Sequence, residues 1–226
     1  MFPIFGVLLV LSLPILLVDC NNILNMLPSL VSWMFGLMLI EQILTGAGPL
    51  KVSVDAHGLI SVEMGWPRVH TSLREEIKSL SGELHLTDDA LDKVGCYSLG
   101  NPHLVTYDMG HFESRSRLGP IWESAPRDGV NVSFAEVVNQ EAIKLHVYER
   151  GCGWTYGCGT GACAAVYHGY LNNLFNDGVT IDVELPGGHL KIEISARGLV
   201  MWGDAREVYR GELLTSPTGL SRDSSR

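Results

Sequence analysis

The 226-residue sequence has no lysine or arginine before Lys51, and only Asp19 and Glu41 carry a charge among its first 50 residues. In the whole chain 16 basic residues stand against 25 acidic ones, and the formal charge is −9. This balance argues against a general nucleic-acid binder. The five cysteines are an odd and irregularly spaced set, too few for a disulfide scaffold. We therefore expect a reducing, cytoplasmic environment in which at least one cysteine stays a thiol.

Two apolar runs, residues 1–18 and 23–40, dominate the N-terminal part of the chain. Each is near the lower length limit for crossing a bilayer. Three interpretations stay open: a signal peptide or anchor without the usual positive start, a membrane hairpin without basic flanks to orient it, or a segment that is buried or foreign to the fold. Membrane association through this segment is therefore the alternative to a purely cytoplasmic location.

From residue 50 onward the sequence is typical of a protein with many short strands and one central helix. Hairpins are predicted over 51–64 and 179–194, and further strands over 84–86, 96–99, 104–107, 130–138, 143–148, 199–202 and 207–214. The alanine-rich segment 162–171 is predicted to be a helix that Asn172 and Asn173 end. These elements predict an α+β fold in which a sheet wraps around that helix.

The passage 148–165 holds the candidate chemistry. A predicted strand ends in Glu149 and Arg150, and a glycine-rich loop then leads to a helix with Cys158 at its N-terminus. The free N–H groups and the positive dipole end of a helix can hold a carboxylate. The same field is expected to lower the pKa of the thiol, into the range of roughly 3.5–7.5 found for activated cysteines. Such a thiol suits nucleophilic attack or proton transfer at carbon.

Two other functions fit this passage less well. A nucleotide-binding loop would end in Gly-Lys-Ser/Thr, which is absent from the passage. Cys152, Cys158, Cys163 and His168 contain no Cys-x-x-Cys step, so we expect no metal site. Cys163 is interpreted as a small core residue and Cys152 as a loop residue without a role.

Several motifs, in the same order along the chain, resemble those of the diaminopimelate epimerase family. They are Gly100-Asn101-Pro102-His103, Gly129–Val132, Glu149-Arg150-Gly151, Cys158–Ala164, Leu185–Gly188 and Val208–Glu212, within a match over about 46–214. The resemblance implies two pseudo-symmetric domains, each a curved, mostly antiparallel sheet around a central helix, with the active site between them. It divides the chain into an apolar segment 1–45 (replaced, frame-shifted or membrane-associated), a first-domain remnant 46–68, a second domain 69–206, and a returning strand with a polar tail over 207–226.

The function implied by the resemblance is the interconversion of LL- and meso-diaminopimelate, in lysine and peptidoglycan biosynthesis, without a cofactor. In this family a thiolate removes the α-proton from one face while a thiol of the other domain delivers a proton to the opposite face. Cys158 matches the second-domain cysteine, and His103 and Glu149 match residues that position and tune the acid and base. Substrate contacts are implied for Asn101, Asn131, Glu149, Arg150, Gly159 and Thr160.

We expect Arg150 to be buried and to face a substrate carboxylate, rather than only to pair with Glu149. The expected partner is the small-molecule substrate, with no nucleic acid, and a homodimer is left open. Charge that develops on the substrate carboxylate would be stabilised by helix N-termini.

The sequence departs from the family in its first half. The first-domain motif Cys-Gly-Asn-Gly-x-Arg-Cys is not found, although Cys20-Asn21-Asn22 lies at about the corresponding distance before Met64-Gly65. The passage Trp154-Thr155-Tyr156 is also bulkier than its counterpart in the family. Three hypotheses follow: an epimerase whose second acid/base comes from Cys20 or an added partner, a catalytically inactive relative that keeps a carboxylate-binding half-site, and a sister racemase or isomerase of the same fold.

Overall fold

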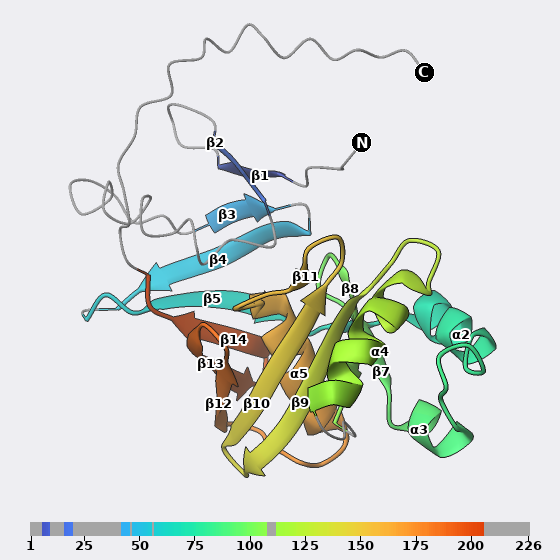
Figure 1. Ribbon diagram of the computed structural model, residues 1–226. Helices are drawn as coiled ribbons and strands as arrows, with labels where there is room; N and C mark the ends of the chain where they lie inside the picture. Colours follow the sequence, from blue (N-terminus) through green and yellow to red (C-terminus); the bar gives the residue numbers. More distant parts are fainter. Residues whose placement is uncertain are drawn as a thin grey trace, which may run out of the picture.

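A computed structural model describes residues 6–9, 16–19, 42–45, 47–55, 57–107 and 112–205 (Figure 1). Its helices are α2 (Thr71–Ser79), α3 (Asp88–Asp92), α4 (Phe112–Ser124) and α5 (Gly159–Leu171). Its strands are β1 (Gly6–Leu9), β2 (Leu16–Asp19), β3 (Gln42–Thr45), β4 (Gly48–Val54), β5 (Ile60–Gly65), β6 (Arg68–Val69), β7 (Gly95–Ser98), β8 (Pro102–Thr106), β9 (Asn131–Asn139), β10 (Ala142–Glu149), β11 (Gly153–Trp154), β12 (Thr180–Leu185), β13 (Gly188–Ser195) and β14 (Gly198–Gly203).

The strands form one continuous sheet in the order β2-β1-β3-β4-β5-β14-β13-β12-β10-β9-β8-β7-β6, with β11 added at the end of β10. Neighbouring strands run antiparallel except for the pairs β8–β9 and β10–β12, which are parallel. Figure 1 shows the sheet curving around α5, which packs against β7–β10, β13 and β14. The predicted α+β fold, a mostly antiparallel sheet around a central helix, is confirmed.

Helix α5 is buried on most sides because its residues are small and apolar nearly all the way round. It packs on the inner face of the sheet with side chains such as Val105, Leu145 and Ile192. A second cluster, which includes Trp122 of α4 and Phe134 of β9, covers the outer face of the same strands. The first residues of β9 are therefore buried on both faces, which places any polar side chain among them out of contact with solvent.

Most of the predicted elements that fall on described residues are confirmed, including both hairpins and the helix ending at Asn172. The strand predicted over 84–86 is wrong, because His85 has a positive φ of 54° and the N–H of Leu86 turns back to donate to the carbonyl of Ser81. Helices α2, α3 and α4 were not predicted. The short α2 is capped by the His70 ring instead of the usual Ser, Thr, Asp or Asn, and α4 contains Pro120.

Strands β1 and β2 lie in the apolar N-terminal segment and pair as an antiparallel hairpin, and β1 also pairs with β3. Within the described ranges, no helix is long and apolar enough to cross a membrane. Most of 1–45, including Cys20, and the strand predicted over 207–214 lie outside the described residues.

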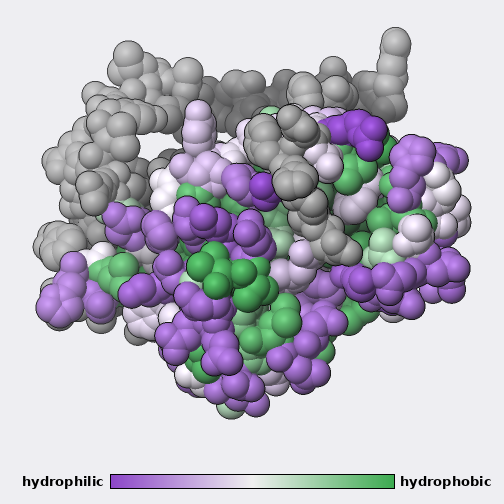
Figure 2. All heavy atoms as spheres, turned by 60° about the horizontal axis from the view of Figure 1, so that its bottom comes forward, coloured by the Kyte–Doolittle hydropathy of each residue, from purple (hydrophilic) through white to green (hydrophobic). Residues whose placement is uncertain are grey.

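The C-terminal end of α5 is the end opposite Cys158, and Leu171 and Leu174 are exposed there. Seen from below in the view of Figure 1, the surface carries hydrophobic groups near its centre with hydrophilic groups around them (Figure 2).

Candidate functional site

Cys158 caps the N-terminus of α5. Its Sγ accepts a hydrogen bond from the backbone N–H of Gly161 at 3.3 Å, the role that a Ser, Thr, Asp or Asn side chain usually fills. The side chain is buried, and the hydroxyl of Thr160 lies 3.6 Å from the sulfur. A Cβ on Gly161 would lie only 3.2 Å from Sγ and 3.1 Å from Val147, so the glycine allows the sulfur to approach the helix closely. The expected position of Cys158 at a helix start is confirmed.

Three neighbouring strands bring polar side chains beneath this helix end. His103 of β8 pairs with Asn131 of β9, and Tyr148 of β10 pairs with Val132, so that Glu149 follows beside Asn131. Side chains alternate between the faces of a strand, so His103, Asn131 and Glu149 lie on the face that packs against α5. All three side chains are buried.

The His103 ring is tied to the first turn of α5 through Nε2. This nitrogen lies 3.1 Å from Oδ1 of Asn101 and 3.0 Å from the hydroxyl of Thr160, and the Asn101 amide donates to the same hydroxyl at 3.3 Å. Because Oδ1 can only accept, Nε2 carries the ring proton. The other ring nitrogen, Nδ1, is buried without a partner among the described residues.

His103 is therefore held as a neutral ring. Burial, and then the positive charge of Arg150, lower its pKa to about 3. A charged imidazolium would also leave an unpaired proton on Nδ1 in a buried position. The ring can donate to Asn101 and Thr160 but does not act as a cation at neutral pH.

The electrostatic environment of Cys158 is opposite to the one predicted from the sequence. Burial and then the nearby negative charge of Glu149 raise the pKa of the thiol to about 12. Hydrogen bonds from Thr160 and Gly161 favour the thiolate, but they are smaller effects. The predicted lowering of the Cys158 pKa is wrong because the helix terminus does not compensate for the loss of solvent and for a carboxylate at close range.

The remaining predicted residues lie around this centre. Gly159 and Thr160 are the first two residues of α5, and Oδ1 of Asn131 accepts a hydrogen bond from the backbone N–H of Arg150 at 2.9 Å. The prediction of a buried Arg150 is wrong, since its side chain is only half-buried. Its Nη1 donates to the carbonyl of Asp128 at 2.9 Å, and its side-chain carbons pack against Gly129.

Two polar residues next to the site were missed by the sequence analysis. The hydroxyl of Thr155 donates to Oε1 of Glu149 at 2.6 Å. The hydroxyl of Ser133, on the same face of β9 as Asn131, is buried near Gly161 and has no partner among the described residues. Ser133 follows from the alternation along β9, whereas Thr155 was recognised only as part of a bulky passage.

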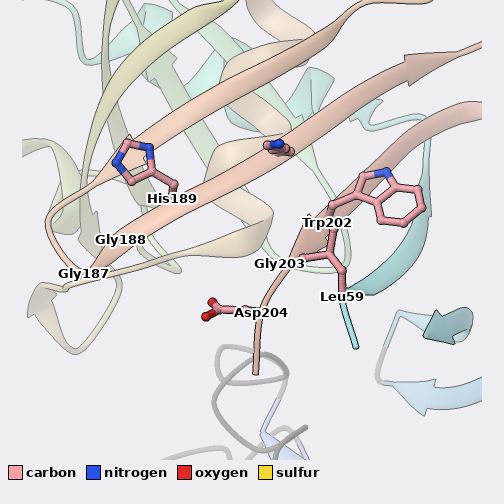
Figure 3. A pocket seen from close by; sticks show the side chains of 8 residues that line it. Leu59, Gly187, Gly188, His189, Trp202, Gly203 and Asp204 are labelled. Carbon is pink, nitrogen blue, oxygen red and sulfur yellow. The ribbon is translucent and has the colours of Figure 1, made fainter. Parts of the chain in front are cut away.

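A cavity of about 590 Å³ lies elsewhere, over β13 and β14. Figure 3 shows His189, Trp202 and Asp204 at this cavity, and none of the predicted site residues is in its lining. His189 and Trp202 alternate along their strands with the core residues Leu190 and Met201, so the cavity is on the face of the sheet away from α5. In the part of the chain that the structure describes, no group of three or more His, Cys, Asp or Glu residues could hold a metal ion.

The chain is similar to known proteins in its sequence and in its fold. The diaminopimelate epimerase of Cyanothece sp. is 37% identical over 183 residues, which are 76% of this chain and 64% of the relative. That of Thioalkalivibrio sulfidiphilus is 38% identical over 178 residues, 75% of this chain and 63% of the relative. The chain therefore spans a little under two thirds of the length of the curated relatives it matches.

A similar fold occurs among solved structures. The hydroxyproline epimerase from Agrobacterium vitis superposes with a TM-score of 0.57 over 87% of this chain and 70% of its own, at 13% sequence identity. At the level of sequence, a model of the diaminopimelate epimerase family matches residues 95–208, which include β7 to β14 and every predicted site residue. The chain belongs to the diaminopimelate epimerase family.

Proposed function

We propose that the chain acts on LL- and meso-diaminopimelate, and that Cys158 transfers a proton at the α-carbon of this small-molecule substrate without a cofactor. The observation that carries the proposal is the buried Cys158 thiol at the start of α5, with the negative charge of the Glu149 carboxylate near it. Family membership supports the substrate, because the relatives that the chain matches are diaminopimelate epimerases.

The proton can move between two groups of the site. In the resting protein the thiol is neutral, since its pKa is raised to about 12, and the nearby Glu149 carboxylate is the group that can take its proton. Transfer of this proton to the carboxylate leaves a thiolate that accepts hydrogen bonds from Gly161 and Thr160. The thiolate then takes the α-proton of the substrate, and in the reverse direction the thiol returns a proton to the carbanion.

The substrate carboxylate next to the reacting carbon is expected at the start of α5. The N–H groups of the first residues of a helix have no acceptor within the helix, so those of Gly159 and Thr160 point toward an approaching anion. Negative charge that builds up on this carboxylate as the α-proton leaves is stabilised by the same groups. Asn101 and Asn131 border the same region through their contacts with Thr160 and Arg150.

In the domain division that we propose, residues 69–206 form the unit around α5, and 46–68 contribute β4 and β5 as the continuation of the sheet beyond β14. Full epimerisation also needs an acid or base on the opposite face of the α-carbon. Because the sequence lacks the family's first-domain cysteine motif, the second candidate function is exchange of the α-proton on one face without inversion.

Incubation with LL-diaminopimelate in D₂O separates these functions. Deuterium at the α-carbon together with meso product supports an epimerase, and deuterium without inversion supports single-face exchange. Cys158→Ala is expected to abolish both, whereas Cys152→Ala, at an exposed cysteine, retains the wild-type behaviour. Cys20→Ala tests the second acid/base, since inversion but not exchange is then lost. No deuterium incorporation by the wild-type protein would refute the proposal.

A further inference from the structure

Thr155 and Glu149 are joined by a hydrogen bond of 2.6 Å in which the threonine hydroxyl donates to Oε1. We propose that Thr155 is a positioning residue whose hydroxyl holds the Glu149 carboxylate, charged and correctly oriented, against the Cys158 thiol. The inference rests on the proposed function, because it concerns the group that exchanges a proton with Cys158. Thr155 itself is not assigned a contact with the substrate.

The loop that carries Thr155 is anchored so that its hydroxyl stays over Glu149. Strand β11 pairs with the end of β10, with Trp154 opposite Tyr148 and Gly153 opposite Glu149. The Trp154 ring packs edge-on against Tyr148, with ring centroids 5.3 Å apart, and lies 5.7 Å from the ring of Phe134. The backbone N–H of Thr155 then returns to the carbonyl of Val147 at 3.3 Å. The contacts of Trp154 and of the Thr155 backbone therefore hold Thr155 in place beside the end of β10.

A buried carboxylate needs such a donor. Glu149 is only 3% exposed, so its charged form has lost most of its hydration. A hydrogen bond to an ionised group is short and stronger than one between neutral groups, and it favours the charged form. A bond at one oxygen also fixes the rotation of the carboxylate plane. Both effects matter for Cys158, because only a charged and correctly turned carboxylate can accept the proton of the thiol.

Three variants isolate the hydroxyl. Thr155→Val keeps the shape and the β-branch of the side chain but removes the donor. Thr155→Ser keeps the donor and removes a methyl group. Thr180→Val, at an exposed position of β12, is the matched control for the same chemical change far from the site.

The first measurement is the rate of deuterium incorporation from D₂O into LL-diaminopimelate as a function of pH. In Thr155→Val we expect kcat to fall about tenfold or more, the order of the loss of a hydrogen bond to a charged group, with KM unchanged. The acid limb of the pH profile moves to higher pH. The Glu149 carboxylate must be charged to accept the proton, and loss of the hydrogen bond makes its charged form less stable. Thr155→Ser and Thr180→Val retain the wild-type rate and profile. An unchanged profile in Thr155→Val, or a loss in Thr155→Ser equal to that in Thr155→Val, would overturn the proposal.

The second measurement does not depend on catalysis. In protein labelled with ¹³C at the glutamate carboxyl groups, the signal of Glu149 is assigned by its absence in Glu149→Gln and followed during a pH titration. Its midpoint is expected at higher pH in Thr155→Val than in the wild type, by about one unit or more, and Thr155→Ser restores it. Equal midpoints would exclude the positioning role even in an active enzyme. If the wild type exchanges no α-proton while the midpoint still shifts, the proposed function fails and the assignment of Thr155 as the residue that holds Glu149 stands.

Discussion

The neutral state of His103 makes the stability of the protein depend on pH in a way that one substitution can isolate. The ring is buried, its Nδ1 has no partner among the described residues, and its pKa is lowered to about 3. In the unfolded chain the same ring has a pKa of about 6.5. As the pH falls below 6.5, the unfolded state binds a proton that the folded state excludes, so the folded protein loses stability. Above pH 6.5 neither state is charged and His103 contributes no pH dependence.

The size of the effect follows from the two pKa values. Between pH 6.5 and pH 3 the free energy of unfolding falls by about 1.4 kcal/mol for each pH unit on account of this one ring. From pH 7 to pH 5 the loss is about 2 kcal/mol. In His103→Gln this term is absent, while the glutamine amide can still donate toward Asn101 and Thr160 in place of Nε2. The other titratable groups are common to both proteins, so the difference between the two curves is assigned to His103.

The assay is urea unfolding of the wild type and of His103→Gln at pH 7 and at pH 5, followed by circular dichroism. We expect the variant to lose about 2 kcal/mol less than the wild type between these two pH values, whatever its stability at pH 7. His57→Gln, at an exposed position in the turn after β4, serves as the control and follows the wild-type curve. Identical slopes for the wild type and His103→Gln would mean that the ring is not held neutral, and the argument from burial would be refuted.

Two further substitutions test the packing near the two ends of α5. Gly161→Ala would bring a Cβ within 3.1–3.2 Å of three side-chain atoms, including the Cys158 sulfur, so we expect at least a tenfold loss of α-proton exchange. The free energy of unfolding should change by about 1 kcal/mol or less, because alanine favours the helix by a similar amount. The control Gly157→Ala, where a Cβ meets nothing within 4 Å, should retain exchange. Tyr97→Phe removes the hydroxyl that lies 2.7 Å from Nδ1 of His168 in the core, so the free energy of unfolding in urea should fall by about 1–2 kcal/mol. The control Tyr156→Phe, at a side chain that is 80% exposed, should leave the free energy of unfolding unchanged. Equal effects of a variant and its control would contradict the corresponding contact.

The elements that hold the site could be predicted because their sequences carry a strong local signal. Strict alternation over 143–148 predicts β10, and a glycine-rich passage followed by alanines predicts the start of α5. Helices α2 and α3 carry local signals that the prediction did not use, namely Leu73 and Ile77 four residues apart on one side of α2 and Thr87 as the N-cap of α3. Helix α4 has Gly119 and Pro120 near its centre, and its position is decided by packing on the outer face of β9 and β10. The local sequence pattern does not reveal tertiary contacts of this kind.

The sequence predicts which residues form the candidate site, but their geometry depends on pairings between distant strands. His103 and Asn131 share the face of Glu149 only because β8, β9 and β10 lie side by side in this register. A shift of one residue in either pairing would turn these side chains toward α4 instead of α5. The order of motifs along the chain predicts which residues belong to the candidate site, whereas the contact of Thr155 with Glu149 requires the return of β11 onto β10.

The pKa of Cys158 was predicted with the wrong sign because the sequence reveals the helix terminus but not the burial. A helix N-terminus stabilises an adjacent negative charge by about 2 kcal/mol at most, equivalent to little more than one pKa unit. Removal of the thiolate from water, together with a carboxylate beside it, acts in the opposite direction and is larger. Since the thiol is then neutral at pH 7, the ability of Cys158 to act as a base depends on a proton acceptor at its side. Glu149 is the carboxylate that occupies this position, so the chemistry proposed for the cysteine is inseparable from the residues that keep Glu149 charged and in place.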